Sequence, residues 1–559
     1  MRHNRWMLRL YAYGAYGVAL ILATVGIAGC LGELGNPDGT RPDDDDNGGG
    51  EVTLPDGTES TALLPARIRR LTNAEYDTSV RALTGTSRRP SEAFAPDSRQ
   101  DGFTVNDAQR VDGVVAKQLA ASAEALAAEV KGKLAELAPC ADPVGQAEGC
   151  AATFIASFGE RAYRRPLDAA EADALLTVYR VGAKGATYAD GVELVARALL
   201  QSAGFLYLTE LGDGSRGAAV ALTPHELASS LSYLITAGPP DDVLLEAARS
   251  GALSTPEGRE IEVRRLLQTS AARERIVRVV REWLGIDRIA ATAKDSNVYP
   301  GFDEIRPSLE RETEAFVGEL LTKSAGTVGE LLGADWTVVD EPLAAFYGAP
   351  GAGRVSLSNR RGILNQGAFL SVYAHATETA PVLRGVTVLR RVTCTTIPSP
   401  TELNINVVPP MPDPNKTTRE RFEIHSTDQE CRSCHNRIDP IGFSFERFDG
   451  MGRLRSAGVD EAGHPVDSAV TLAMNAEYDG AYADSNELAK ALSTSAAVRS
   501  CFARHVFRAS AGRSDAAAVE SEASFLKAWA AVPEAEQGGI VETLVTYAKS
   551  NLFSHRRAQ

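Results

Sequence analysis

The chain has 559 residues, of which 44% are hydrophobic and 23% charged, a globular balance that excludes a disordered chain and a multi-span membrane protein. With 58 Lys and Arg against 73 Asp and Glu, its formal net charge is -15, so no basic face is available to neutralise phosphates and nucleic acid is not an expected partner. Aromatic residues make up only 6%, whereas Ala and Leu are abundant, which favours helices packed on helices.

The first thirty residues have the layout of an export signal, with arginines before an apolar stretch that is too short for a membrane-spanning helix. The stretch ends in Ile27-Ala28-Gly29-Cys30, which resembles the lipobox of bacterial lipoproteins. We therefore predict a signal peptide over 1–29, lipidation of Cys30, and a lipid anchor on the periplasmic face of the envelope, at the outer membrane. A plain anchor and an ordinary cleaved signal are the alternatives. Residues 30–65 are polar and Gly-rich and are expected to form a disordered tether.

Seven cysteines occur, at positions 30, 140, 150, 394, 431, 434 and 501. Outside the cytosol each needs an explanation, because thiols oxidise there. Cys140 and Cys150 bracket a short loop with Pro and Gly that closes easily into a disulfide. The cysteines at 431 and 434 share a motif of their own, so by elimination Cys394 pairs with Cys501.

Helix starts are marked by three capping boxes, Thr72 with Glu75, Asp168 with Glu171 and Thr223 with Glu226. Apolar residues with a 3.6-residue period predict further helical stretches at 107–138, 187–203, 256–285, 304–324, 360–372, 383–394 and 486–551. Period-two alternation is confined to about 453–473, where Gly and Pro separate segments suited to one short β-hairpin. The predicted fold class is therefore mainly α, with several consecutive small helical modules.

The sequence Cys431-Arg432-Ser433-Cys434-His435 has the spacing of covalent haem attachment. On a helical turn the two sulfurs lie on one side and the imidazole follows, so two thioether bonds and one imidazole–iron bond hold a single porphyrin. The motif predicts a haem c cofactor. The alternatives are a disulfide between Cys431 and Cys434, bare thiols at these positions, and a zinc site completed by another histidine.

Two further expectations concern the surroundings of this motif. Pro440 is predicted to end the helix, and a nearby backbone carbonyl to accept the Nδ1–H of His435. The candidates for a sixth iron ligand are Met451, Met411, His375 and His425, of which Met451 and His375 are preferred. The alternative for Met451 is a turn residue packed on the core.

Several stretches together resemble a known family. They are RLTNAEY at 70–76, FGERAYRRPL at 158–167, ELASSLSY at 226–233, PPDD at 239–242, TETAPVLRG at 377–385 and the block 431–455. In this order they resemble the multi-module proteins of unknown function, abundant in planctomycetes and myxobacteria, that carry planctomycete cytochrome-type (PSD) domains. One departure is Ala380, where relatives commonly have serine, so a hydroxyl role in that loop is in doubt.

The resemblance implies export, successive helical modules and a cytochrome-like segment that contains the Cys431-Cys434-His435 triplet. The predicted modules are 66–140, 150–213, 220–350, 359–473 (cytochrome-like) and 483–555. We predict an exported lipoprotein with one c-type haem, which carries electrons to or from a periplasmic redox partner or supports an oxidoreductase step. The alternative is a non-redox helical scaffold or binding lipoprotein, in which Cys431 and Cys434 form a structural disulfide.

Overall fold

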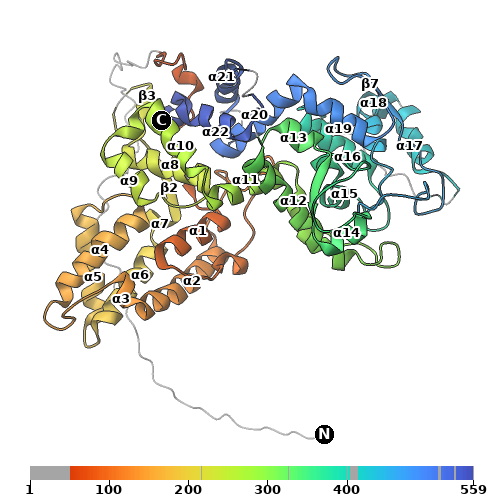
Figure 1. The fold of residues 1–559 in the computed structure, drawn as a ribbon. Coiled ribbons are helices and arrows are strands. Elements are labelled where there is room, and N and C mark those ends of the chain that lie inside the picture. The colour runs from red at the N-terminus through yellow and green to blue at the C-terminus, as the bar shows by residue number, and fades with distance from the viewer. Residues whose placement is uncertain are drawn as a thin grey trace, which may run out of the picture. The chain divides into compact units, whose positions relative to one another are not determined.

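The computed structural model describes residues 51–557 apart from 216, 325, 400, 403–412, 414, 428, 514–517 and 534–536. The described chain is mainly helical, as its composition predicts, and its strands form small two-stranded antiparallel sheets (Figure 1). Short 3₁₀ turns lie at Ser60–Ala62, Pro90–Ala93, Ala252–Ser254, Ile286–Ala291 and Ile363–Asn365.

The first group of helices has a core of its own. Its members are α1 (Asn73–Thr84), α2 (Gly113–Gly132), α3 (Leu134–Leu137), α4 (Ala147–Tyr163), α5 (Ala169–Ala183), α6 (Tyr188–Gln201) and α7 (Ala203–Leu206). Fully buried side chains such as Leu126, Val195 and Leu199 fill the space between α2, α4 and α6. The strands β1 (Arg67–Arg70) and β2 (Tyr207–Glu210) pair at the two ends of this segment and close it.

The second group is larger and packs on the rest of the chain. It contains α8 (Pro224–Thr236), α9 (Asp242–Arg249), α10 (Pro256–Leu266), α11 (Ser270–Trp283), α12 (Phe302–Lys323), α13 (Val328–Gly333) and α14 (Glu341–Tyr347), with the hairpin β4 (Trp336–Val339) and β5 (Gly353–Ser356). The single helix predicted at 256–285 is two helices. Thr269 caps the second, because its side chain accepts a hydrogen bond from the Ala272 amide.

The third group contains α15 (Gly367–Val372), α16 (Pro381–Thr387), a π-helical turn at Val388–Val392, α17 (Thr418–Thr427), α18 (Gln429–Phe443), β6 (Val470–Leu472) and β7 (Gly480–Tyr482). The hairpin of β6 and β7 lies at the end of the stretch 453–473 and extends beyond it. Inside that stretch, an isolated bridge joins Val459 to Pro465.

The C-terminal helices pack against the second and third groups. They are α19 (Ser485–Thr494), α20 (Ala496–Ala511), α21 (Val519–Ala530), α22 (Ile540–Lys549) and α23 (Asn551–Ser554), so the stretch predicted at 486–551 is several helices. The last strand, β8 (His555–Arg557), pairs with β3 (Ala219–Ala221) ahead of α8. One core cluster accordingly contains buried residues from Ala62 to Phe553 and is shared by the second, third and C-terminal groups.

The three predicted capping boxes are confirmed, at the starts of α1, α5 and α8. In each box the cap side chain accepts from the third amide of the helix, and the Glu side chain accepts from the amide of the cap residue. Each satisfies two donors that would otherwise have no partner in the first turn, and a cap of this kind contributes about 1 kcal/mol.

Candidate functional site

The Cys-x-x-Cys-His motif lies on α18, which packs against α16. Two glycines allow the close approach: a Cβ at Gly385 would lie 2.2 Å from the carbonyl oxygen of Ile438, and one at Gly442 would lie 2.1 Å from that of Pro381. Any larger residue at either position would collide with backbone. The helix pair that carries the motif therefore depends on two residues that the sequence alone does not single out.

The prediction that Pro440 ends this helix is wrong, because α18 continues to Phe443. A proline inside a helix removes one backbone hydrogen bond and costs about 3 kcal/mol. The side chains of Ile438 and Ile441 are almost fully buried on either side of it, and burial of two such side chains contributes about 3 to 6 kcal/mol. Tertiary packing of the two isoleucines thus outweighs the tendency of proline to end a helix.

Cys431 and Cys434 lie one turn apart on α18, and both are half-buried. Neither takes part in the two disulfides of the described chain. Cys434 also packs against the main core. Together with His435, these two residues do not form a cluster with ligand atoms close enough to share one metal ion; among the described residues, such a cluster occurs at Cys394, Cys501 and His505.

The imidazole of His435 is oriented by a carboxyl group of the same helix. Its Nδ1 lies 2.8 Å from Oδ1 of Asp439, one turn further on, and the Asp439 side chain is buried. The second oxygen of Asp439, Oδ2, is also buried and has no hydrogen-bond partner within the described part of the chain. The prediction that a backbone carbonyl is the partner of the His435 Nδ1 is wrong. A side chain four residues further along a helix lies close enough to take this place. The spacing His-x-x-x-Asp is the signal that identifies it.

A cavity of about 410 Å³ opens beside His435, between α17, α18 and β6. Its apolar wall comes from Phe422, Pro440, Phe443 and Val470, and the rings of Phe422 and Phe443 meet edge to face with centroids 6.3 Å apart. The volume falls within the range of small-molecule and cofactor sites, which are mostly apolar with a few polar groups. The cavity lining includes His435 but neither Cys431 nor Cys434, so the apolar space is open to a group that approaches the imidazole.

The polar part of the cavity wall includes Arg419 of α17. Its guanidinium lies 4.7 Å from the centre of the Phe443 ring and donates to the carbonyl oxygens of Asp467 and Ala469, at 2.8 and 3.0 Å. These bonds join α17 to the chain just before β6. Arg419 thus supplies a fixed positive charge at the cavity, and Glu420 contributes an exposed carboxylate beside it.

The predicted sixth ligands lie elsewhere. Met451 is 1% exposed and packs within the main core, as the alternative interpretation holds, and His375 is on the surface. Neither lines the cavity beside His435. Met411 and the side chain of His425 lie outside the described residues.

A buried arginine holds the loops around this region. Arg384 of α16 is fully buried, donates to the carbonyl oxygens of Leu370 and Asp449 at 3.1 and 3.2 Å, and pairs with Glu446 at 3.3 Å. Thr379 donates to the same Glu446 at 2.7 Å. The stretch TETAPVLRG and the block after Cys431 are therefore joined by one buried network.

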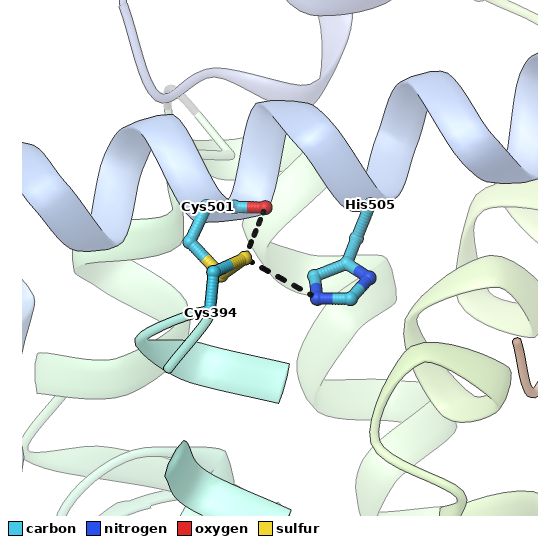
Figure 2. Close-up of side chains that lie close together, drawn as sticks. All are labelled: Cys394, Cys501 and His505. Carbon is cyan, nitrogen blue, oxygen red and sulfur yellow. Dashed lines mark hydrogen bonds between the residues drawn. A yellow bond between two sulfur atoms is a disulfide. The ribbon is translucent and has the colours of Figure 1, made fainter. Parts of the chain in front are cut away.

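A second cysteine–histidine group is assembled from distant parts of the chain (Figure 2). Cys394 and Cys501 form a disulfide, and Nε2 of His505 lies 3.7 Å from the Cys394 sulfur. Because the sulfurs are bonded to each other, they are not available as thiolate ligands. Burial lowers the pKa of His505 to about 3, although the nearby Asp101 opposes this shift. Cys394 has a positive φ of 51°, a conformation that costs a non-glycine residue about 1 to 2 kcal/mol.

The other disulfide joins Cys140 to Cys150 and ties the loop before α4 to that helix. Cys30 and the predicted signal lie outside the described residues. Within the described ranges, the structure contains no helix with the length and apolar character needed to span a bilayer.

The sequence matches four families of unknown function in succession: PSD3 (DUF1587) at residues 69–132, PSD5 (DUF1595) at 150–210, PSD4 (DUF1592) at 222–349 and PSCyt3 (DUF1588) at 360–458. The PSCyt3 segment contains α16, α17 and α18. Fold and site thus define a mainly helical, multi-module protein with a cytochrome-like segment. The chain belongs to the multi-module family built from these PSD and PSCyt3 domains. No curated protein and no protein of solved structure matches it.

Proposed function

We propose that the chain is an exported protein with one covalently attached c-type haem on α18, and that it transfers single electrons. The observation that carries the proposal is the position of His435, beside a cavity of about 410 Å³ with an apolar wall and with its Nδ1 engaged by Asp439. The two cysteines that precede it in the same helix remain outside the disulfides. The PSCyt3 match supports the same assignment.

Each residue has a definite task in this proposal. Cys431 and Cys434 would hold the haem through thioether bonds, and His435 would offer Nε2 to the iron because its Nδ1 is held by Asp439. Phe422 and Phe443 supply the apolar wall against which the porphyrin would pack. The bound haem supplies one-electron redox chemistry, and the protein tunes it through ligation, burial and nearby charge.

The proposal has two forms, an electron carrier and an oxidoreductase, and they differ in whether the sixth coordination position of the iron is filled. The described residues around the cavity include one histidine, His435, and no methionine. An iron with an open position binds carbon monoxide in the ferrous state and suits an oxidoreductase, whereas a filled position suits an electron carrier. Carbon monoxide difference spectra of the reduced protein distinguish the two.

The test of haem attachment is expression of the full chain with a c-type haem maturation system. We expect a Soret band and a pyridine haemochrome that stay with the polypeptide after denaturation. The variant Cys431→Ala, Cys434→Ala loses this covalent pigment. The matched control Cys140→Ala, Cys150→Ala also removes two cysteines and keeps it. A wild-type chain that matures without covalent pigment would contradict the proposal and leave the helical scaffold as the better description.

We also propose that Cys30 anchors the protein by lipid to the periplasmic face of the envelope, at the outer membrane. The support is the Ile27-Ala28-Gly29-Cys30 sequence that follows an apolar stretch with arginines ahead of it. Metabolic labelling with radioactive palmitate should mark the wild-type chain, and Cys30→Ser should remove the label. Equal labelling of the two chains would contradict this assignment.

A further inference from the structure

A small buried cavity lies where the C-terminal strand meets the first sheet, and it belongs to a different part of the fold from α18. It has a volume of about 20 Å³ and is lined by side chains from β1, β2, α8, α11, α20, α22, α23 and β8. The residues used below are Arg67, Arg69, Glu210, Arg275, Tyr547 and Arg556. A space of this size holds one water molecule or one monatomic ion.

The cavity wall carries four guanidinium groups and one carboxylate. That carboxylate, Glu210, already accepts from Arg67 at 2.7 Å, from Arg556 at 2.9 Å and from Ser230 at 3.0 Å. Arg69 is paired in a bidentate manner with Glu75, at 2.7 and 2.8 Å. The two carboxylates, Glu210 and Glu75, are thus paired with three of the four arginines.

Arg275 of α11 is the arginine without such a partner. It is 4% exposed, its Nη2 lies 3.5 Å from the carbonyl oxygen of Ala509, and its buried Nε has no hydrogen-bond partner among the described residues. Glu282, two turns further along α11, attracts it electrostatically. The carboxylate of Glu282 accepts from Thr104 instead, at 2.7 Å, and no ion pair within 4.0 Å joins Glu282 to Arg275 in the described chain. Burial lowers the pKa of Arg275, and the attraction of Glu282 and Glu75 does not offset this effect. A guanidinium stays charged in proteins, so Arg275 brings to the cavity a buried positive charge without an ion pair.

We infer that this cavity binds a chloride ion, held by Arg275 and by the positive field of Arg67 and Arg556. A buried guanidinium without an ion pair is costly, and a water molecule supplies no negative charge to pair with it. Phosphate and carboxylate ligands are too large for the space. Tyr547 lines the same cavity, and its hydroxyl makes no hydrogen bond within the described residues, so it is available as a second donor.

The ion would join three parts of the chain. Arg67 belongs to β1 in the first group, Arg275 to α11 in the second, and Arg556 to β8 at the C-terminus. A ligand that binds only the folded state stabilises it in proportion to the logarithm of its concentration. Chloride is therefore expected to strengthen the packing of the C-terminal strand on the N-terminal half.

The test is thermal unfolding of the full chain in sodium chloride and in sodium gluconate at matched ionic strength. We expect the Tm of the wild type to rise by about 1 °C for each tenfold rise in chloride above the dissociation constant, given the unfolding entropy of a chain of this size. Arg275→Met should remove this dependence.

The matched control is Arg259→Met, which removes another buried arginine. Arg259 hydrogen-bonds only backbone carbonyls, and it lies outside this cavity. This variant should lower the Tm and keep the chloride dependence.

A wild-type Tm that is equal in the two salts, or an Arg275→Met variant with the full dependence, would overturn the inference. A second measurement applies if Arg275→Met fails to fold. Crystals of the wild-type chain grown with sodium bromide should give an anomalous peak in the cavity, and a water molecule without an anomalous signal would overturn the assignment.

Discussion

The chain contains two groups of two cysteines and one histidine, and they differ in sequence separation, disulfide bonding and the burial of the imidazole. Cys431, Cys434 and His435 come from one turn of α18, the sulfurs are not joined, and the imidazole lies beside a cavity. The other group comes from positions 394, 501 and 505, its sulfurs form a disulfide, and its imidazole is 2% exposed. The rings of Phe103 and Trp283 lie beside His505, and Phe502 packs on Trp283 in turn.

The difference separates the group that we propose binds a haem from a group that stabilises the fold. A local triplet keeps its geometry as long as the helix exists, so the space next to it can be left open for a cofactor. A group assembled over a separation of 107 residues exists only in the folded chain, and it contributes by restricting the unfolded chain. Residue composition alone would not distinguish the two.

The largest expected effect is the loss of the long-range disulfide. Cys394→Ala, Cys501→Ala should lower the free energy of unfolding by about 4.7 kcal/mol, the value for a loop of roughly 100 residues. Cys140→Ala, Cys150→Ala removes a loop with a separation of only 10 residues and should cost about 3 kcal/mol or slightly less. Chemical denaturation of the haem-free protein measures both.

The matched control for this ranking is Cys431→Ala, Cys434→Ala, also in the haem-free protein. It removes two half-buried thiols outside the disulfides and should change the free energy of unfolding by about 0.5 kcal/mol. A loss comparable with that of the short disulfide would show that these thiols stabilise the haem-free fold, and it would weaken the contrast between the two groups.

The next effect concerns pH and His505. Because burial lowers its pKa from 6.5 to about 3, the unfolded chain takes up a proton between these values that the folded chain does not. The resulting contribution to stability is complete above pH 6.5 and is lost as the pH falls toward 3, by about 1.4 kcal/mol per pH unit. His505→Gln should therefore reduce the slope of stability against pH by one proton in this window, measured by urea denaturation at several pH values.

Phe502→Leu provides the control for the pH experiment. Phe502 is buried and its ring packs on Trp283 with centroids 5.0 Å apart, so its truncation destabilises the same region without removing a titratable group. This variant should show lower stability at every pH and the same slope as the wild type. A His505→Gln variant with an unchanged slope would mean that the imidazole gains or loses its proton equally in the two states.

The fold class and the helix starts could be predicted from the sequence because they depend on local chemistry. The Thr72 and Glu75 capping box needs only residues three apart, and the helix that follows it has an apolar face with a regular period. Helix ends were harder to predict. At Thr269 a cap interrupts a continuous periodic pattern, and at Pro440 the burial of neighbouring isoleucines overrides a residue that normally stops a helix.

The site could be predicted only as far as it is local. The spacing of Cys431, Cys434 and His435 is visible in the sequence, whereas the cavity beside them needs Phe422 and Val470, which come from two other elements. The same limit applies to Arg275, because its lack of an ion pair depends on where the acids of β2 and α1 place their oxygens. Such features follow from tertiary packing and have no local pattern.

The smallest effect is a test of how Asp439 tunes the proposed haem. Because the imidazole lies 2.8 Å from its carboxyl oxygen, Asp439 makes His435 a more electron-rich ligand and should stabilise the oxidised iron. Asp439→Asn keeps the shape of the side chain and removes the charge, so the midpoint potential should rise by an amount on the order of tens of millivolts in a spectroelectrochemical titration. Glu420→Gln removes a carboxylate from the cavity rim that does not touch His435, and its effect should be smaller because solvent screens it. Equal shifts in the two variants would mean that Asp439 acts only through its charge and not through its bond to the imidazole.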